Sequence, residues 1–212
     1  MKRRFFSQLG ATLLAAAGIW GMSAVYAADE APDVLVKRLS SDVLAAIKAD
    51  AAIQAGDTAR IVKLVDTRVM PYVNFQRMTA SAVGPGWRQA TPEQQKRLQD
   101  EFKILLVHSY SGALSQVGDQ TINVKPLRAA ADDTDVLVRT EIRGHGDPIQ
   151  LDYRLEKTPG QGAGWKIYNF NVMGVWLVQN YLSQFSQEIN AKGIDGLIAK
   201  LTALNKSNAT KS

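Results

Sequence analysis

The residues best suited to acid–base or metal chemistry in this chain are two histidines and three clustered aspartates. His108 lies within a helical pattern, so we interpret it as a partly buried, hydrogen-bonded structural residue. His145 stands between two glycines, which is typical of a solvated turn. Asp132, Asp133 and Asp135 lack the regular spacing and terminal glutamate of a calcium-binding loop, so we favour a polar turn there.

The sequence offers no other signal for catalysis or redox chemistry. It contains no hydrolytic, phosphate-loop or dinucleotide-binding motif. It also contains no cysteine, and therefore no thiol nucleophile, thiolate metal site or lipoprotein acylation site. We expect a protein that is not an enzyme and that carries neither a cofactor nor a metal.

The first 27 residues have the pattern of a secretory signal peptide. A mostly apolar stretch runs from Leu9 to Trp20, and small residues Val25 and Ala27 precede a cleavage point. Ahead of that stretch lies a basic segment formed by Lys2, Arg3 and Arg4. We predict that residues 1–27 are removed and that the mature protein is soluble and exported.

The charge of the chain gives no reason to expect nucleic-acid binding. The formal net charge is +5, and three of the basic residues lie in the predicted signal peptide. No cluster of Lys and Arg with interleaved aromatic residues is present. Nothing after the signal peptide is typical of a linker, so we expect one domain over residues 28–204 and a disordered polar tail over residues 205–212.

Hydrophobic periodicity divides the mature chain into helical and strand segments. Helix caps are expected at Asp57, Asn74 and Thr91, where Thr91 opens a capping box, while Pro71 should end or kink the second helix. We expect helices over residues 32–54, 57–71, 74–83, 91–117, 175–193 and 195–204. Alternating apolar residues predict antiparallel strands over residues 122–124, 136–143, 149–156 and 165–173, the last at a central position. This order indicates an α+β fold with helices covering one face of a small sheet.

Large apolar and aromatic side chains are abundant on these elements. For any single one of them, core packing is the simpler interpretation. The set comprises Phe75, Met78, Trp87, Phe102, Tyr110, Trp165, Tyr168, Phe170, Met173, Trp176, Tyr181 and Phe185.

Several short segments, taken in order, resemble the MlaC family of toluene-tolerance or ABC-transporter auxiliary proteins. In the first half they are Pro71-Tyr-Val-Asn-Phe, Gly84-Pro-Gly-Trp-Arg-Gln-Ala-Thr-Pro-Glu-Gln-Gln and Phe102 with Tyr110. In the second half they are Asp135-Val-Leu-Val, Tyr153-Arg-Leu, Trp165-Lys-Ile-Tyr-Asn-Phe-Asn-Val-Met-Gly-Val, Asn180-Tyr-Leu-Ser-Gln-Phe and Gly193-Ile-Asp-Gly-Leu. The match covers essentially the whole mature chain.

The resemblance implies a periplasmic phospholipid shuttle that maintains the lipid asymmetry of the outer membrane. Its partners would be phospholipid, an inner-membrane ABC transporter complex and an outer-membrane lipoprotein–porin complex, each touched transiently. The implied fold is a small curved antiparallel sheet of the nuclear-transport-factor-like and cystatin-like group, wrapped by helices that enclose an apolar cavity. The implied ligand is a diacyl phospholipid with its acyl chains in that cavity.

The residues that we predict to bind lipid combine helix and strand faces that point into one interior. They are Val69, Val73, Phe75, Met78, Trp87, Phe102, Leu105, Leu106, Tyr110, Leu114, Val138, Ile142, Leu151, Tyr153, Val172, Val175 and Tyr181.

Two other functions remain open from the residues alone. One is an enzyme of the nuclear-transport-factor-like fold that acts on an apolar small molecule through a buried Asp or Tyr. The expected strand registers turn Asp152, Glu141 and Glu156 away from the apolar face, which counts against it. The other is a scaffold without a ligand, which a solidly filled interior would favour.

Overall fold

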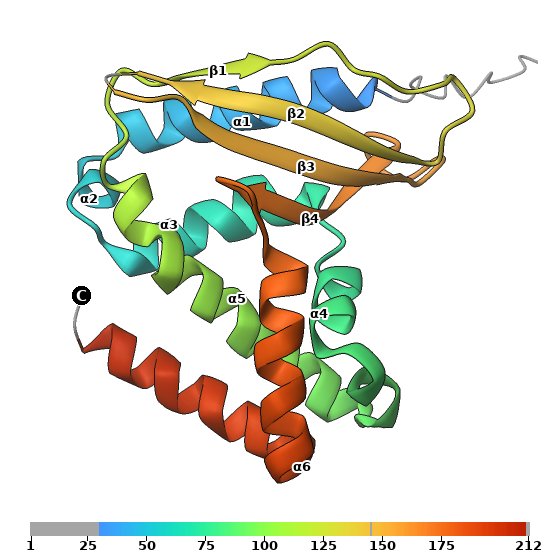
Figure 1. Ribbon diagram of the computed structural model, residues 1–212. Coiled ribbons are helices and arrows are strands. Elements are labelled where there is room, and N and C mark those ends of the chain that lie inside the picture. Colours follow the sequence, from blue (N-terminus) through green and yellow to red (C-terminus); the bar gives the residue numbers. More distant parts are fainter. Residues whose placement is uncertain (1–29, 145, 211–212) are drawn as a thin grey trace, which may run out of the picture.

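The computed structural model describes residues 30–144 and 146–210, so the predicted signal peptide lies outside the described residues. Helices precede and follow a run of strands (Figure 1). The first helical part comprises α1 (Pro32–Ala49), α2 (Ala51–Gln54), α3 (Thr58–Leu64), a π-helical turn (Val65–Val69), a 3-10 turn (Met70–Tyr72), α4 (Phe75–Val83), a 3-10 turn (Gly84–Gln89) and α5 (Pro92–Leu114). The strands are β1 (Thr121–Val124), β2 (Asp135–Arg143), β3 (Ile149–Lys157), β4 (Trp165–Val172) and β5 (Val175–Trp176), and α6 (Leu177–Ala209) follows.

The strands form one antiparallel sheet in the order β1-β2-β3-β4-β5, which confirms the predicted α+β class. In Figure 1, α1 runs along β1 and β2, while α4, α5 and α6 gather below β3 and β4. None of the helices in the described part of the chain is long and apolar enough to span a bilayer.

β4 lies between β3 and β5, so it has a neighbour on each side as predicted, but it is not the middle strand. Its outer neighbour is only the two-residue β5 and a single bridge between Val73 and Ile167. Side chains of β4 also contact the helices α4 and α6. Tyr168 lies under the Arg77 guanidinium of α4, 3.5 Å from the ring centre, and Asn169 accepts a hydrogen bond from the Val178 amide of α6 at 3.2 Å.

The three predicted helix caps are confirmed. The side chains of Asp57, Asn74 and Thr91 each accept a hydrogen bond from a backbone amide three residues later, at 3.0, 3.0 and 3.2 Å. Gln94 completes the capping box by accepting from the Thr91 amide at 2.9 Å. These bonds satisfy amides that have no partner inside a helix.

The first helix and the helix over residues 91–117 have other bounds than predicted. The first helix is interrupted at Asp50, whose carboxylate accepts hydrogen bonds from the Ala52 and Ile53 amides and so starts α2. Apolar periodicity continues across this break, which is why the sequence predicts one helix. The helix of residues 91–117 ends at Leu114, three residues earlier than expected.

The C-terminal segment is more ordered than its polar sequence predicts. The α6 segment consists of two helices separated by non-helical backbone at Gly193 (φ 71°, ψ −173°), and the second helix continues through residue 209. Asn205 is buried and donates to the main-chain oxygen and side-chain carboxylate of Glu101, at 2.9 and 2.8 Å. The break at Gly193 separates two helices, as predicted, and Asp195 lies near the start of the second, where its side chain accepts a hydrogen bond from Gln94 at 2.7 Å. Specific polar contacts with α5 therefore replace the expected disordered tail over residues 205–209.

Glu101 should make the docking of α6 dependent on pH. Burial favours a raised pKa for its carboxyl, but hydrogen bonds from Thr202, Asn205 and Arg97 outweigh burial and hold that pKa below the usual range. A lowered folded-state pKa gives stability that is complete above the unfolded pKa of about 4.3 and disappears as the pH falls below it. In thermal melts between about pH 5 and pH 3, we expect the wild-type melting temperature to fall more steeply than that of Glu101→Gln. At pH 7 the variant should be about 1–3 kcal/mol less stable than the wild type. Melting temperatures of the two proteins that fall in parallel as the pH is lowered would contradict this account.

The turn after α4 requires glycine. Gly84 has φ 68° and ψ −141°, a conformation that side chains oppose, and a Cβ there would lie 2.8 Å from Leu182 of α6. We expect Gly84→Ala to lower the free energy of unfolding by about 1–3 kcal/mol in urea titrations. Gly112→Ala is the matched control, because a Cβ at this helical position meets nothing within 4 Å. The control should gain up to about 1 kcal/mol, and equal effects of the two changes would contradict the argument.

Candidate functional site

The potential catalytic residues do not converge. His108 is partly buried, but its Nδ1 has no hydrogen-bond partner among the described residues, unlike the hydrogen-bonded histidine predicted. His145 lies outside the described residues. Asp133 accepts from the Ala130 amide at 2.8 Å and closes the predicted polar turn. Across residues 30–144 and 146–210, no group of three or more His, Cys, Asp or Glu side chains could hold a metal ion.

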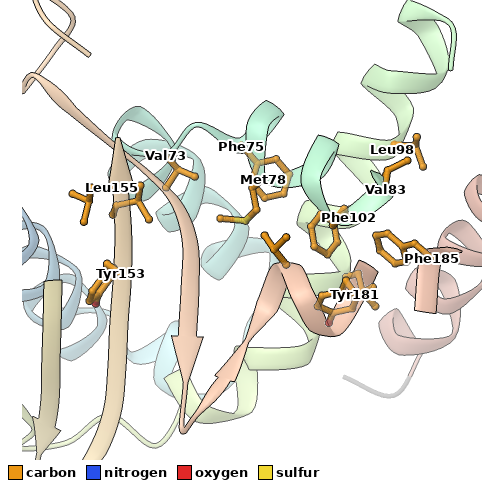
Figure 2. Close-up of a cluster of buried hydrophobic side chains, with 14 of the residues drawn as sticks. Val73, Phe75, Met78, Val83, Leu98, Phe102, Tyr153, Leu155, Tyr181 and Phe185 are labelled. Atoms are coloured by element: carbon orange, nitrogen blue, oxygen red, sulfur yellow. The ribbon is translucent and has the colours of Figure 1, made fainter. Parts of the chain in front are cut away.

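Apolar side chains from the sheet, α1, α4, α5 and α6 do converge, and we call their buried set the main apolar cluster. It comprises Leu35, Val36, Leu39, Val73, Phe75, Met78, Ala82, Val83, Ala90, Leu98, Phe102, Leu105, Val136, Val138, Tyr153, Leu155, Trp165, Ile167, Val178, Tyr181, Phe185, Leu197 and Leu201. Figure 2 shows its central side chains reaching from β3 and α4 toward α5 and α6.

Twelve of the seventeen residues predicted to bind lipid lie in or against the main apolar cluster. The buried ones are Val73, Phe75, Met78, Phe102, Leu105, Val138, Tyr153 and Tyr181. The partly buried ones packed against the cluster are Val69, Trp87, Leu106 and Leu151. The structure therefore brings most of the predicted set together in one interior.

The other five predicted residues lie farther out. Tyr110, Ile142 and Val172 are partly buried, and Val175 is 50% exposed. Leu114 packs instead against a second apolar cluster, formed by Ile47, Ile53, Ile61, Leu64 and Val107 from α1, α2, α3 and α5. Helical spacing alone aligns Leu114 with Tyr110 and cannot reveal that the end of α5 meets another set of partners.

Aromatic rings form the centre of the main apolar cluster. The Phe102 ring lies 5.8 Å from Phe75, 4.9 Å from Tyr181 and 5.3 Å from Phe185 (Figure 2). These contacts join α4, α5 and α6 through one side chain. The residue prediction omits Phe185 and the fully buried Leu155 and Ile167, although helical spacing on α6 and alternation on β3 and β4 would have included them.

Tyr153 is the one strongly perturbed acid inside the cluster. Burial raises the pKa of its phenol to about 12, and the hydroxyl shares a 3.0 Å hydrogen bond with Ser40 of α1. The ring meets Phe170 edge to face at 5.5 Å. A phenol with this pKa stays protonated near neutral pH, so it is a poor general base. The uncharged ring can pack against an apolar ligand.

The buried carboxylate nearest to Tyr153 along the chain lies on the other face of the sheet. Asp152 is only 3% exposed, and it accepts hydrogen bonds from the Thr140 amide at 3.3 Å and from Gln150 at 2.5 Å. Strand alternation separates it from Tyr153 and Leu151, as the predicted register requires. The main apolar cluster therefore lacks the carboxylate that the alternative enzyme would need from this strand.

Two hollows in the surface lie away from the predicted residues. One, of about 490 Å³, is lined by Arg97, Asp195, Ile198, Ala199, Thr202, Ala203 and Lys206. The other, of about 380 Å³, is lined by Ser81, Arg154, Tyr168, Asn169, Trp176, Val178 and Gln179. Neither contains a residue predicted to bind lipid. Most of the predicted residues converge in the apolar interior between sheet and helices, which we therefore take as the candidate site.

Comparison with known proteins gives matches over most of the chain. A family model described as MlaC protein matches residues 37–203. A phospholipid-binding protein from Ralstonia solanacearum, whose structure was solved in complex with a phospholipid, is 46% identical. That match has a TM-score of 0.78 and covers 82% of this chain and 96% of the other.

Two curated relatives match at lower identity. The intermembrane phospholipid transport system binding protein MlaC of Haemophilus influenzae is 24% identical over 176 residues, which are 82% of each chain. The toluene tolerance protein ttg2D of Pseudomonas putida is 26% identical over 170 residues, which are 79% of this chain and 77% of the relative.

Proposed function

Because this chain belongs to the MlaC family, we propose that it binds a diacyl phospholipid and carries it through the periplasm. The acyl chains lie between β2–β4 and helices α4–α6, against the main apolar cluster, and the headgroup faces solvent. The observation that carries the proposal is the 46% identity to a protein solved with a bound phospholipid, together with the convergence of the predicted residues in one interior.

The energy of the ligand explains why a carrier needs such an interior. Two acyl chains carry on the order of 30 methylenes, and at about 0.8 kcal/mol each their exposure to water costs roughly 25 kcal/mol. A soluble carrier must cover nearly all of that surface. Transfer from a bilayer costs far less, because one apolar environment replaces another. Small differences in fit and in partner contacts then set the direction of transfer.

The proposed route runs between an outer-membrane lipoprotein–porin complex and an inner-membrane ABC transporter complex. A freely diffusing carrier can serve both, since neither end of the route requires the chain to enter a membrane permanently. The result of such transport is the removal or delivery of phospholipid at the outer membrane, which maintains its lipid asymmetry.

Uptake from vesicles tests the binding proposal. Protein stripped of lipid in denaturant, refolded and mixed with vesicles of radiolabelled phospholipid should carry about one lipid per protein after the vesicles are removed. Protein that refolds to its original circular dichroism spectrum and yet carries no label would contradict the proposal.

The location has its own test. If residues 1–27 form a signal peptide, mature protein from cells should begin at Ala28 and appear in the osmotic-shock fraction. Mass spectrometry of the intact protein gives its N-terminus. An uncleaved chain beginning at Met1 in the membrane pellet would overturn both the export and the periplasmic route.

A further inference from the structure

The turn between β4 and β5 has an unusual residue at its tip. Met173 and Gly174 connect the paired residues Val172 and Val175, and both have positive φ, 51° and 87°. A two-residue hairpin loop of this type favours Asn-Gly, because asparagine tolerates positive φ better than longer side chains do. Among the described residues Met173 is the one non-glycine with positive φ, and its side chain is 71% exposed. Neither the turn nor the core explains a methionine here.

Two further exposed apolar residues lie beside Met173. Ile149 is 41% exposed at the start of β3, and Val175 is 50% exposed. The Met173 amide donates to the oxygen of Gln150 at 2.9 Å, which ties the turn to β3 next to Ile149. We call Ile149, Met173 and Val175 the apolar tip. The other large apolar residues exposed to a similar degree in the described chain, Val34 and Leu204, lie on α1 and α6.

A lipid surface would fit the chemistry around the apolar tip. One residue behind the tip, Trp176 and Arg139 lie in the same cross-strand row on the outer face of the sheet. Trp176 is partly buried, and Arg139 is exposed without an ion-pair partner in the described part of the chain. The apolar tip and the tryptophan behind it match the order of hydrocarbon and interface in a bilayer, and Arg139, in the same row as Trp176, can meet the lipid phosphates at that interface.

Part of the backbone at the turn is already paired. Pairing of Val172 with Val175 and of Asn171 with Trp176 continues to the turn, and the Met173 amide already has its acceptor. Groups left unpaired would oppose entry into hydrocarbon.

We propose that the β4–β5 turn touches the lipid surface during exchange, with the side chains of the apolar tip entering the acyl region of the bilayer. This inference rests on the proposed function, because it gives the carrier a point of direct contact with the lipid it exchanges. Val172 and Leu151 pair directly behind the tip and lead toward the main apolar cluster. An acyl chain can then pass from bilayer to interior along a continuous apolar surface.

The absence of cysteine from the sequence allows a single fluorescent label at a chosen position. We would label the variants Met173→Cys and Leu204→Cys with an environment-sensitive nitrobenzoxadiazole dye and add equimolar phosphatidylethanolamine–phosphatidylglycerol vesicles. Emission at position 173 should shift to the blue and rise about twofold or more, while position 204 should not change. Unchanged emission at position 173 while the same protein takes up lipid would overturn the inference and leave the proposed function standing. Unchanged emission without uptake would overturn both.

A substitution separates the role of the side chain from the stability of the turn. Met173→Asn creates the favoured Asn-Gly loop, so the melting temperature should stay constant or rise by about 2–4 °C. Initial lipid uptake from the same vesicles should fall about tenfold, the factor expected from losing the burial of one apolar side chain. Leu204→Asn is the matched control and should leave uptake unchanged. Uptake by Met173→Asn at the wild-type rate would overturn the inference. If emission at position 173 does not change when vesicles are added, while Met173→Asn loses transport in cells, the apolar tip would instead contact a protein partner.

Discussion

Replacing Val138 by tryptophan is expected to abolish phospholipid binding while the helices and strands remain intact. Val138 is fully buried in the main apolar cluster, and it pairs with Tyr153 across β2 and β3. If acyl chains lie between the sheet and the helices, an indole at this position occupies their volume. Lipid extracted from the purified variant should fall at least about tenfold, while its melting temperature stays within a few degrees of lipid-free wild type.

Leu137→Trp is the matched control for this change. Leu137 precedes Val138 on β2 and points to the opposite face of the sheet, so the added ring should not affect bound lipid. An ordinary packed core would give another result, because overpacking typically costs about 1–3 kcal/mol. A melting temperature that falls by several degrees while lipid binding persists would show that Val138 belongs to plain core.

Replacing Phe102 by alanine should produce the largest loss of stability. The ring is fully buried and contacts Phe75, Tyr181 and Phe185 from two other helices. Truncation of a buried phenylalanine leaves a cavity and typically costs about 3–5 kcal/mol. At about 2–4 °C per kcal/mol for a chain of this size, the melting temperature should fall by roughly 10 °C.

Phe170→Ala provides the comparison for Phe102. Phe170 is partly buried and makes one ring contact, with Tyr153. Its truncation should cost about 1–2 kcal/mol when both variants are compared in urea titrations. If the two variants lost equal stability, the assignment of Phe102 as the junction of α4, α5 and α6 would be wrong.

Local signals in the sequence identify most of the fold. Asp57, Asn74 and Thr91 start helices as predicted, because a cap depends on residues within three positions of it. Alternation identifies four of the five strands for the same reason. The two-residue β5 is missed because so short a strand has no measurable period, and its pairing depends on the turn at Met173.

Features that depend on distant partners were predicted less well. Asn205 belongs to a polar segment, and only its contact with Glu101, more than 100 residues away, orders it. The end of α5 illustrates the same limit, because Leu114 faces the second apolar cluster through the placement of α1 and α3. Within the candidate site, residues on the core faces of long, regular elements are found together, while those at element ends lie farther out.

Extraction of the purified protein with organic solvent, followed by mass spectrometry, tests the central claim most directly. Protein isolated from cells without denaturant should release diacyl phospholipid in an amount near one molecule per chain, and Val138→Trp prepared in parallel should release almost none. Wild-type protein that emerges free of lipid from phospholipid-rich cells, and that also fails to take up labelled phospholipid from vesicles, would contradict the account.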